Sequence, residues 1–360
     1  MNFLFYSGMT FHFRSLLPVM KELVDRGENV SVLSRGCFSE KRIRLRPRSF
    51  NDITKKSLQF VSRQIGLRPE FLNRVSFIPF YPHFNIPLRS FYKKQDAFIS
   101  TTKGFVWLNQ FSNEGKLRVA IGYENFLSTY FSVDNNLFSQ EAPSLLRSEE
   151  DIQKNSTVLW IETGLPFVDA YFQRRRVVAS SNKVLLLHPG GYRNVITKMG
   201  ESRESCYAAQ LRLYRTILNA LPPLMSMDIK LHPLAAVYHD RTAHDEFAAD
   251  LDVGIVEGFL GDLLFDYHVI LSLGSSALFE ILPFNRRLWL LDFFGKERTN
   301  QYTDMKCLFI KDIDDLRNKL ASNAEPLFSD LFENKIYKTL VRTADGRSTS
   351  RILDILYNHL

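Results

Sequence analysis

The chain has few of the residues that cross-link a protein and no segment that could anchor one in a bilayer. Its three cysteines are odd in number and widely spaced, which argues against a disulfide framework and against a structural zinc site. No apolar stretch approaches the roughly 18 to 20 residues of a membrane span. The opening MNFLFYSG is too short for the apolar core of a signal peptide. We therefore expect a cytoplasmic protein, at most peripheral on the inner face of the membrane.

Acidic residues are scarce in the first 150 positions, which hold 21 Lys and Arg against 13 Asp and Glu and so carry more than the whole net charge of +7. The densest basic run lies between positions 35 and 48 and includes Arg42, Arg44 and Arg46. Such a surface attracts anionic lipid headgroups or acidic saccharides. A solvated basic face is the alternative. Nucleic acid is not expected as a partner, because no helix-turn-helix, zinc-finger or RNA-binding signature accompanies the charge.

The N-terminal residues follow the pattern of a parallel α/β unit. An apolar strand at 2–6 precedes a helical pattern that ends at Arg26-Gly27, and a second strand follows at 30–33. A strand–helix–strand unit of this kind has a right-handed crossover. His12 and Arg14 lie in the connection after the first strand, where His12 is a candidate catalytic group and Arg14 a candidate acceptor or membrane contact. A structural histidine is the alternative for His12.

Glu124 follows a third expected strand, at 117–121, within the segment GYEN. A carboxylate just past the C-terminal end of a strand lies where ligands bind in open α/β sheets. Partial burial would raise its pKa and allow it to take a proton from an acceptor hydroxyl as a general base. A helix-capping or surface role is the alternative. Residues 38–95 show no clean period, so we expect only helices and loops that decorate the domain there.

Three expected strands in the second half, at 183–187, 228–231 and 269–273, end in small or polar residues. These residues are His188, Gly190, Gly191, Arg193, His232, Pro233, Gly274, Ser275 and Ser276. Because the carboxyl ends of parallel strands share one edge of a sheet, we expect them to converge. Glycines let a backbone approach a ligand, and a turn of small residues at a helix start offers free backbone N–H groups to a phosphate.

Glu280 lies in the helix that should follow the third of these strands. About one turn beyond the phosphate position, its carboxylate could accept hydrogen bonds from the two hydroxyls of a ribose. An ordinary capped helix packed on a sheet is the alternative. No Asp-x-Asp metal motif stands at a strand end, so we expect neither a metal nor another cofactor. His188, Arg193, His232 and helix dipoles would then neutralise the phosphate charge.

Short segments of the chain resemble a known superfamily. KLHP at 230–233 and LGSSALFE at 273–280 look like the C-terminal domain of bacterial GT-B surface-polysaccharide transferases. That group includes capsule-type Kdo transferases, sialyltransferases with an HP motif, and CDP-glycerol glycerophosphotransferases. ETGLPFVDAYF at 162–172 resembles the segment with which such enzymes leave their N-terminal domain. Residues 122–143 are loosely similar to a stretch of the capsule Kdo transferases.

The resemblance implies an α/β fold of the GT-B type, in which two Rossmann-like domains face each other across a cleft. We place an acceptor-binding domain at 1–177 and a nucleotide-sugar-binding domain at 178–341. A C-terminal helix within 342–360 would pack back toward the first domain.

The same resemblance implies roles for individual residues. His232, Ser275 and Ser276 would bind the donor phosphate, and Glu280 would bind the ribose. Glu124 would be the catalytic carboxylate, with His12 as the next candidate. The acidic motif of bacterial sialyltransferases is not evident, and GYEN replaces the residues expected in glycerophosphotransferases. Donor identity and stereochemistry therefore stay open.

The function we expect is metal-independent transfer of a sugar from a nucleotide-activated donor to a surface polysaccharide or glycolipid. The HP motif favours a CMP-linked acidic sugar such as Kdo over UDP- or CDP-linked donors. Three alternatives remain: a polyol-phosphate transferase of the CDP-glycerol type, a UDP-sugar 2-epimerase, and a non-catalytic glycan-binding subunit.

Overall fold

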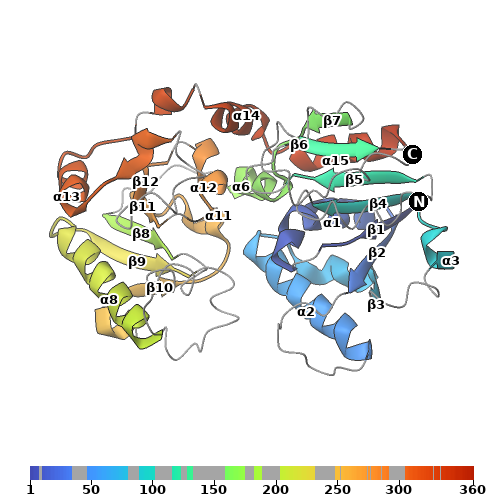
Figure 1. The fold of residues 1–360 in the computed structure, drawn as a ribbon, viewed down its shortest axis with the longest axis horizontal. Coiled ribbons are helices and arrows are strands. Elements are labelled where there is room, and N and C mark those ends of the chain that lie inside the picture. Colours follow the sequence, from blue (N-terminus) through green and yellow to red (C-terminus); the bar gives the residue numbers. More distant parts are fainter. Residues whose placement is uncertain are drawn as a thin grey trace. The chain divides into compact units, whose positions relative to one another are not determined.

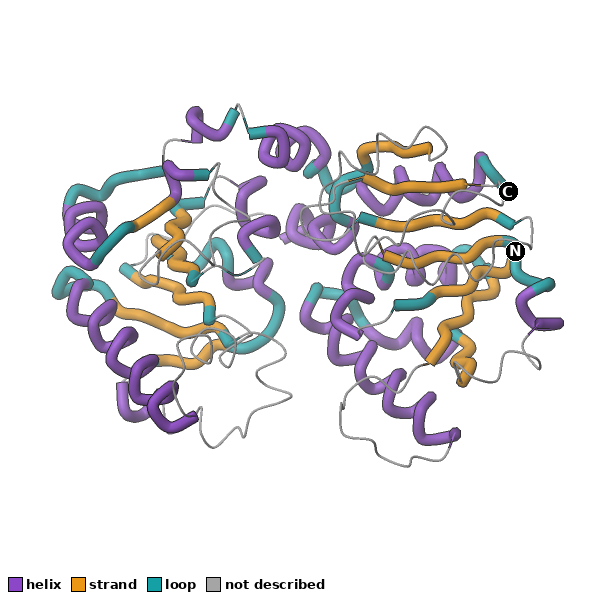
Figure 2. The backbone as a smooth tube through the Cα atoms, in the orientation of Figure 1, coloured by secondary structure: helices purple, strands orange, loops and turns teal. Residues whose placement is uncertain are grey.

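A computed structural model of the chain forms two compact units, one of residues 1–174 with 339–360 and one of residues 175–338. The two units are described separately below (Figures 1 and 2). The structure describes residues 1–7, 10–34, 47–79, 89–101, 116–122, 128–132, 159–174, 182–188, 203–231, 248–251, 253–273, 275, 277–284, 286–291, 305–326, 328–332 and 334–360. Among these residues, no helix is long and apolar enough to cross a membrane.

Unit 1 contains a seven-stranded sheet in the order β3-β2-β1-β4-β5-β6-β7. The strands are β1 (Asn2–Phe5), β2 (Asn29–Ser34), β3 (Ser76–Pro79), β4 (Ala97–Thr101), β5 (Leu117–Ile121), β6 (Ser128–Ser132) and β7 (Leu159–Glu162). The first five in sheet order are parallel, whereas β6 and β7 are antiparallel to their neighbours. β4 and β5 are buried along their whole length, as expected for parallel strands with both faces covered.

The helices of unit 1 lie between its strands in the chain or follow the last of them. They are α1 (Leu17–Asp25), α2 (Pro47–Gln64), α3 (Arg89–Tyr92), α6 (Asp169–Arg174) and α15 (Ser348–Asn358), with 3₁₀ segments η1 (Thr10–Ser15), η2 (Pro69–Arg74) and η7 (Pro166–Val168). In α1, Pro18 fits the first turn, where no backbone donor is needed. Met20, Leu23 and Val24 recur at helical spacing and are buried.

Unit 2 contains a six-stranded sheet that is parallel throughout, in the order β10-β9-β8-β11-β12-β13. Its strands are β8 (Lys183–Leu187), β9 (Ser226–Lys230), β10 (Gly254–Val256), β11 (Val269–Ser272), β12 (Leu288–Leu291) and β13 (Phe309–Ile310). Its helices are α8 (Arg203–Ala220), α11 (Leu260–Leu263), α12 (Leu278–Ile281), α13 (Ile313–Ala321) and α14 (Lys335–Thr343), the last of which continues into unit 1. α8 and α13 share one apolar core with the sheet, in which Tyr214 and Leu316 are fully buried.

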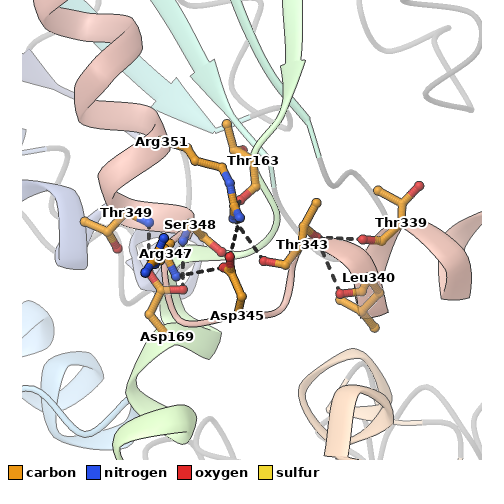
Figure 3. Close-up of polar contacts among 10 residues, drawn as sticks. All are labelled: Thr163, Asp169, Thr339, Leu340, Thr343, Asp345, Arg347, Ser348, Thr349 and Arg351. Carbon is orange, nitrogen blue, oxygen red and sulfur yellow. Dashed lines mark hydrogen bonds and ion pairs between the residues drawn. The ribbon is translucent and has the colours of Figure 1, made fainter.

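The C-terminal segment is tied to unit 1 by a network of polar contacts (Figure 3). The carboxylate of Asp169 accepts hydrogen bonds from the backbone N–H groups of Ser348 (3.0 Å) and Thr349 (2.8 Å), at the start of α15. Arg351 donates to the carbonyl oxygen of Thr163 (3.4 Å). Gly164 has a φ of +78°, and a Cβ placed there would lie 2.8 Å from Ser348 Oγ. The turn after β7 therefore requires glycine, both for its backbone conformation and for space.

Several sequence predictions differ from the observed elements. Residues 38–95 were predicted to form only helices and loops, but they include β3, which is an edge strand of the unit 1 sheet. Its sequence, SFIP, is too short and too mixed to give a strand signal. The boundary between the units falls at 174/175, where the sequence suggested 177/178. The predicted helix after β11 is present but short, since α12 has four residues and passes into a 3₁₀ turn, Leu282–Phe284.

Candidate functional site

The strongest candidate site lies at the carboxyl edge of the unit 2 sheet. Three strands that the sequence predicts to end in small or polar residues lie side by side in this sheet. They are β9, β8 and β11, in that order, and they are parallel (Figure 1). From β8 the chain adds β9 and β10 on one side and then returns to add β11 on the other. The point between β8 and β11 is therefore a topological switch point, where open α/β sheets bind ligands outside the carboxyl ends of their strands.

His188 directly follows β8 at this edge. Its backbone N–H donates to the carbonyl oxygen of Lys230, the last residue of β9, at 2.9 Å. The residue is 5% exposed, and its ring meets that of Tyr214 edge-on, with 6.1 Å between centroids. Packing against a core tyrosine of α8 thus restricts the orientation of the imidazole.

The turn after β11 uses some of its hydrogen-bonding groups internally. The N–H of Ser275 donates to Ser272 Oγ (3.1 Å), and the N–H of Ala277 donates to Ser275 Oγ (3.3 Å). These two N–H groups are therefore not free for an anion, contrary to the sequence prediction. Since α12 has only four residues, its dipole is also smaller than that of a full helix. The Ser275 hydroxyl hydrogen remains a possible donor to a ligand.

Glu280 lies in α12 and is 7% exposed. A buried carboxylate is costly unless other groups compensate its charge. One such group is the ammonium of Lys230, on which Glu280 and Glu257 act electrostatically. The carboxylate that is predicted to bind a ribose therefore interacts electrostatically with the ammonium of Lys230, the last residue of β9.

Lys230 is a residue of this site that the sequence did not single out. It is 8% exposed, and its Nζ donates to the carbonyl oxygen of Gly258 at 2.7 Å. Burial lowers its pKa to about 8, although the carboxylates of Glu280 and Glu257 act in the opposite direction. Lysine is rarely buried unless paired, so a lysine that ends a strand is normally interpreted as solvent-exposed. The one feature of the sequence that could have pointed to Lys230 as a site residue is its position directly before the Leu-His-Pro segment.

In unit 1, the candidates after β1 have different surroundings. His12 lies in η1 and is partly exposed. Arg14 is 3% exposed, and its guanidinium carbon lies 4.3 Å from the ring centroid of Phe167, in η7. A side chain with so little exposure does not present its charge to a membrane surface, so the membrane part of the prediction for Arg14 is wrong, and its part as an acceptor contact stays a prediction. Arg14 forms a cation–π contact within unit 1.

The other predicted site residues lie outside the residues that the structure describes, and their predictions stand as made. They are Arg42, Arg44, Arg46, Glu124, Gly190, Gly191, Arg193, His232, Pro233, Gly274 and Ser276. Within the described part of the chain, no group of three or more His, Cys, Asp or Glu residues is arranged to hold a metal ion.

Comparison with known proteins identifies the fold. No protein-family model matches the chain, and no curated protein matches it by sequence. A UDP-N-acetylglucosamine 2-epimerase has a similar structure, with a TM-score of 0.51 and 15% identity over 100% of this chain and 96% of that one. The wall teichoic acid polymerase TagF has a TM-score of 0.51 and 10% identity, over 99% of this chain and 88% of that one.

A third structure, the UDP-GlcNAc 2-epimerase of Methanocaldococcus jannaschii, has a TM-score of 0.50 and 14% identity over 99% of this chain and 100% of that one. The fold is GT-B. The predicted class of two Rossmann-like domains is thereby confirmed. At these identities the likeness defines the fold alone. GT-B folds in this set belong to proteins with different activities, so function must be argued from the site.

Proposed function

We propose that this GT-B protein is an enzyme that binds a nucleotide-activated sugar through unit 2 and transfers the sugar to a surface polysaccharide or glycolipid. The observation that carries the proposal is the set of polar groups gathered at the edge of β9, β8 and β11. His188, Lys230 and Glu280 are all buried there, although their strands and helix are separate in sequence. A lysine and a histidine at the same sheet edge as a carboxylate, at a switch point, suit the phosphate and the ribose of a nucleotide.

The chemistry follows from the charges that develop during transfer. The bond between the anomeric carbon and the donor phosphate oxygen breaks, and its electron pair leaves with the phosphate. Fixed donors beside that oxygen lower the barrier, because they stabilise the developing charge. We assign this role to His188 and the Ser275 hydroxyl, with Arg193 and His232 as further donors. Glu124 takes the proton of the acceptor hydroxyl as that oxygen attacks the anomeric carbon.

The donor we propose first is a CMP-linked acidic sugar such as Kdo, on the strength of the KLHP and LGSSALFE segments. We further propose that no metal takes part, since basic side chains supply the charge that a divalent cation would otherwise supply. Activity should then survive excess EDTA. We place the enzyme in the cytoplasm, peripherally on the inner face of the membrane.

A UDP-sugar 2-epimerase is the second candidate, because two structures with this activity in their names share the fold over nearly the whole chain. Such an enzyme uses the same nucleotide-binding edge but needs no acceptor. A polyol-phosphate transferase is a third, since TagF also shares the fold. A glycan-binding subunit would bind saccharide without releasing a nucleotide.

Two measurements separate these candidates. A thermal-shift screen with CMP, CDP, UDP and GDP identifies the nucleotide, since a ligand that binds only the folded state raises the melting temperature. The matching nucleotide-sugar is then incubated with and without extracted bacterial glycolipids. Nucleotide release that requires the extract supports sugar transfer. Isomerisation of UDP-GlcNAc without the extract would identify an epimerase, and phosphate in the new linkage a polyol-phosphate transferase.

A further inference from the structure

The last strand of the unit 1 sheet exposes apolar side chains to solvent. β7 pairs with β6 on one side, and within the described residues no strand pairs with its other side (Figure 1). Leu159 is 58% exposed, Trp160 39% and Ile161 42%. Successive side chains of a strand point to opposite faces of the sheet, so β7 exposes apolar groups on both faces. Single exposed apolar residues are common, whereas a contiguous exposed group marks an interaction site.

The edge of the sheet at β7 also has little of what normally protects an edge. Natural sheets block their edges with charged residues or proline, and the sequence of β7 is LWIE. Its one charged residue, Glu162, forms an ion pair with Arg342 of α14, whose side chain is exposed. The carboxylate is therefore compensated, and the cation beside it faces solvent.

The charge of unit 1 favours an anionic partner for this edge. Unit 1 holds 26 Lys and Arg against 18 Asp and Glu, whereas unit 2 holds 20 against 21. A positively charged unit is attracted to anionic lipid headgroups. Two copies of unit 1 repel each other for the same reason, which disfavours pairing of β7 with the β7 of a second copy. The charge distribution therefore favours a lipid surface over a second copy.

The side chains of β7 suit a shallow contact with such a surface. Tryptophan is enriched at the interface between membrane and water, where its ring sits at the level of the headgroups. The outer N–H and C=O groups of an edge strand need water, because unsatisfied backbone groups are costly in hydrocarbon. The side chains can therefore enter the interface while the backbone of β7 stays hydrated.

We propose that β7 is a membrane-contact site, at which Leu159, Trp160 and Ile161 enter the headgroup region of an anionic bilayer while the positive charge of unit 1 attracts the protein to the surface. The inference rests on the proposed function in one respect, since a glycolipid acceptor would bring the enzyme to a membrane. It adds the strand that makes the contact. The apolar contribution of β7 is not screened by salt, whereas the electrostatic contribution is.

Trp160 can report the contact directly. The chain has three tryptophans, of which Trp289 is 2% exposed and Trp107 lies outside the described residues. Bromine atoms on lipid chains quench tryptophan fluorescence only at short range. Vesicles of equal parts phosphatidylglycerol and brominated phosphatidylcholine should therefore quench the wild type, and Trp160→Phe should lose most of that quenching. Equal quenching of the two proteins would overturn the proposal.

The triple variant Leu159→Thr/Trp160→Thr/Ile161→Thr removes the apolar surface without a change in charge, and threonine is favourable in strands. It should bind the same vesicles at least about tenfold more weakly in a sedimentation assay, because burial of one large apolar side chain is worth about that factor. The loss should be equal at low and at raised salt. Nucleotide binding, which we assign to unit 2, should be unchanged.

Leu159→Thr and Leu224→Thr form a matched pair of single variants. Leu224 is 82% exposed and lies in unit 2, between α8 and β9. Only Leu159→Thr should weaken vesicle binding, by about threefold, since its side chain is partly buried already. Equal losses in the two variants would mean that general hydrophobicity governs binding, and the proposal would be wrong. This pair and Trp160→Phe decide the matter even if the triple variant does not fold.

Light scattering tests the alternative of a second copy. A dimeric wild type and a monomeric triple variant would make β7 a subunit interface and refute the membrane contact, whereas two monomers support it. The proposed function fails separately. Quenching of a wild type that binds none of the nucleotides would remove the sugar-transfer proposal and keep the membrane contact. Nucleotide binding without quenching would do the reverse.

Discussion

At the scale of single residues, unit 2 has buried cations at both edges of its sheet. Arg286 and Arg287 precede β12, at the amino edge, and are buried. Arg286 donates to the carbonyl oxygens of Leu264 (3.2 Å) and Tyr267, and Arg287 donates to the carbonyl oxygen of Asn323 (3.0 Å). Arg287 also pairs with the carboxylate of Glu325 (3.3 Å). At the carboxyl edge, Lys230 likewise donates to a backbone oxygen, that of Gly258 (2.7 Å), and the carboxylates of Glu280 and Glu257 act on it electrostatically.

Glu124→Gln is expected to remove turnover while donor affinity survives. The substitution keeps the size of the side chain and part of its hydrogen bonding but removes the charge that accepts a proton. A general base typically contributes about 10²- to 10⁴-fold to the rate. Turnover of the nucleotide-sugar and binding of the nucleotide should be measured on the same preparation. Retention of more than about a tenth of the turnover lies outside that range and would make His12 the next candidate.

At the scale of elements, the sequence identified strands where apolar runs end in turns and missed those where the signal is short or diluted. β8 and β11 are buried apolar runs, and each was predicted. β10 and β13 have only three and two residues, too few for any period. β4 contains Ser100 and Thr101, whose hydroxyls weaken its apolar character although both residues are buried.

The position of the candidate site at the strand ends was predicted from the sequence, but the buried charged residues in it were not. The neighbouring strand ends could be inferred, because parallel strands share an edge. The burial of Lys230 and Glu280 could not, since it depends on how β9 and α12 pack within unit 2. The hydrogen bonds that Ser275 makes within its own turn could not be predicted either. Small residues are compatible with several turn geometries, and only one of them forms these bonds.

α15 has an N-terminal cap that comes from a distant element. No side chain of its own caps the helix, and Asp169 accepts from the Ser348 and Thr349 N–H groups instead (Figure 3). Asp169→Ala leaves both groups without this acceptor and should lower the free energy of unfolding by about 1 kcal/mol, a typical cap value. Urea denaturation measures the loss. Asp354→Ala, an exposed position on the same helix, should have little effect, and equal stability of all three proteins would show that the cap is dispensable.

The same carboxylate should make stability depend on pH. Burial raises the pKa of Asp169, against the opposing effect of the Thr349 and Ser348 N–H groups. The folded state then binds this proton more tightly than the unfolded state, whose carboxyl titrates near about 4. The contribution of Asp169 to stability therefore decreases as the pH rises from about 4 through the raised pKa. Asp169→Asn has no titrating group at this position. Over that pH interval, the free energy of unfolding of wild type should therefore decrease relative to that of Asp169→Asn.

At the scale of the whole molecule, the distribution of charge is uneven along the chain. The net charge of +7 arises in the part that we propose binds the acceptor. The fold is shared by proteins named for sugar isomerisation and for wall teichoic acid polymerisation, so it does not choose an acceptor. A surface charge does bear on that choice, because it selects for anionic partners before any specific contact forms.

The basic run from 35 to 48 is expected to hold the enzyme on an anionic membrane. Each cation near such a surface contributes about 1 kcal/mol, and salt screens the attraction. Arg42→Glu, Arg44→Glu and Arg46→Glu together should therefore reduce co-sedimentation with vesicles that contain anionic phospholipid at low salt, while nucleotide binding is unchanged. Raising the salt should lower the sedimentation of wild type to that of the variant.

Net charge alone could produce part of this effect, so the control must change it equally. Reversal of Lys311, Arg317 and Lys338, which are exposed in unit 2, removes the same charge from the other unit. We expect this control to sediment nearly as wild type does, because attraction to a surface falls off within a Debye length of about 10 Å at 0.1 M salt. Equal losses in both triple variants would mean that overall charge, and not the 35 to 48 run, governs binding. No loss in either would mean that the run is only a solvated face.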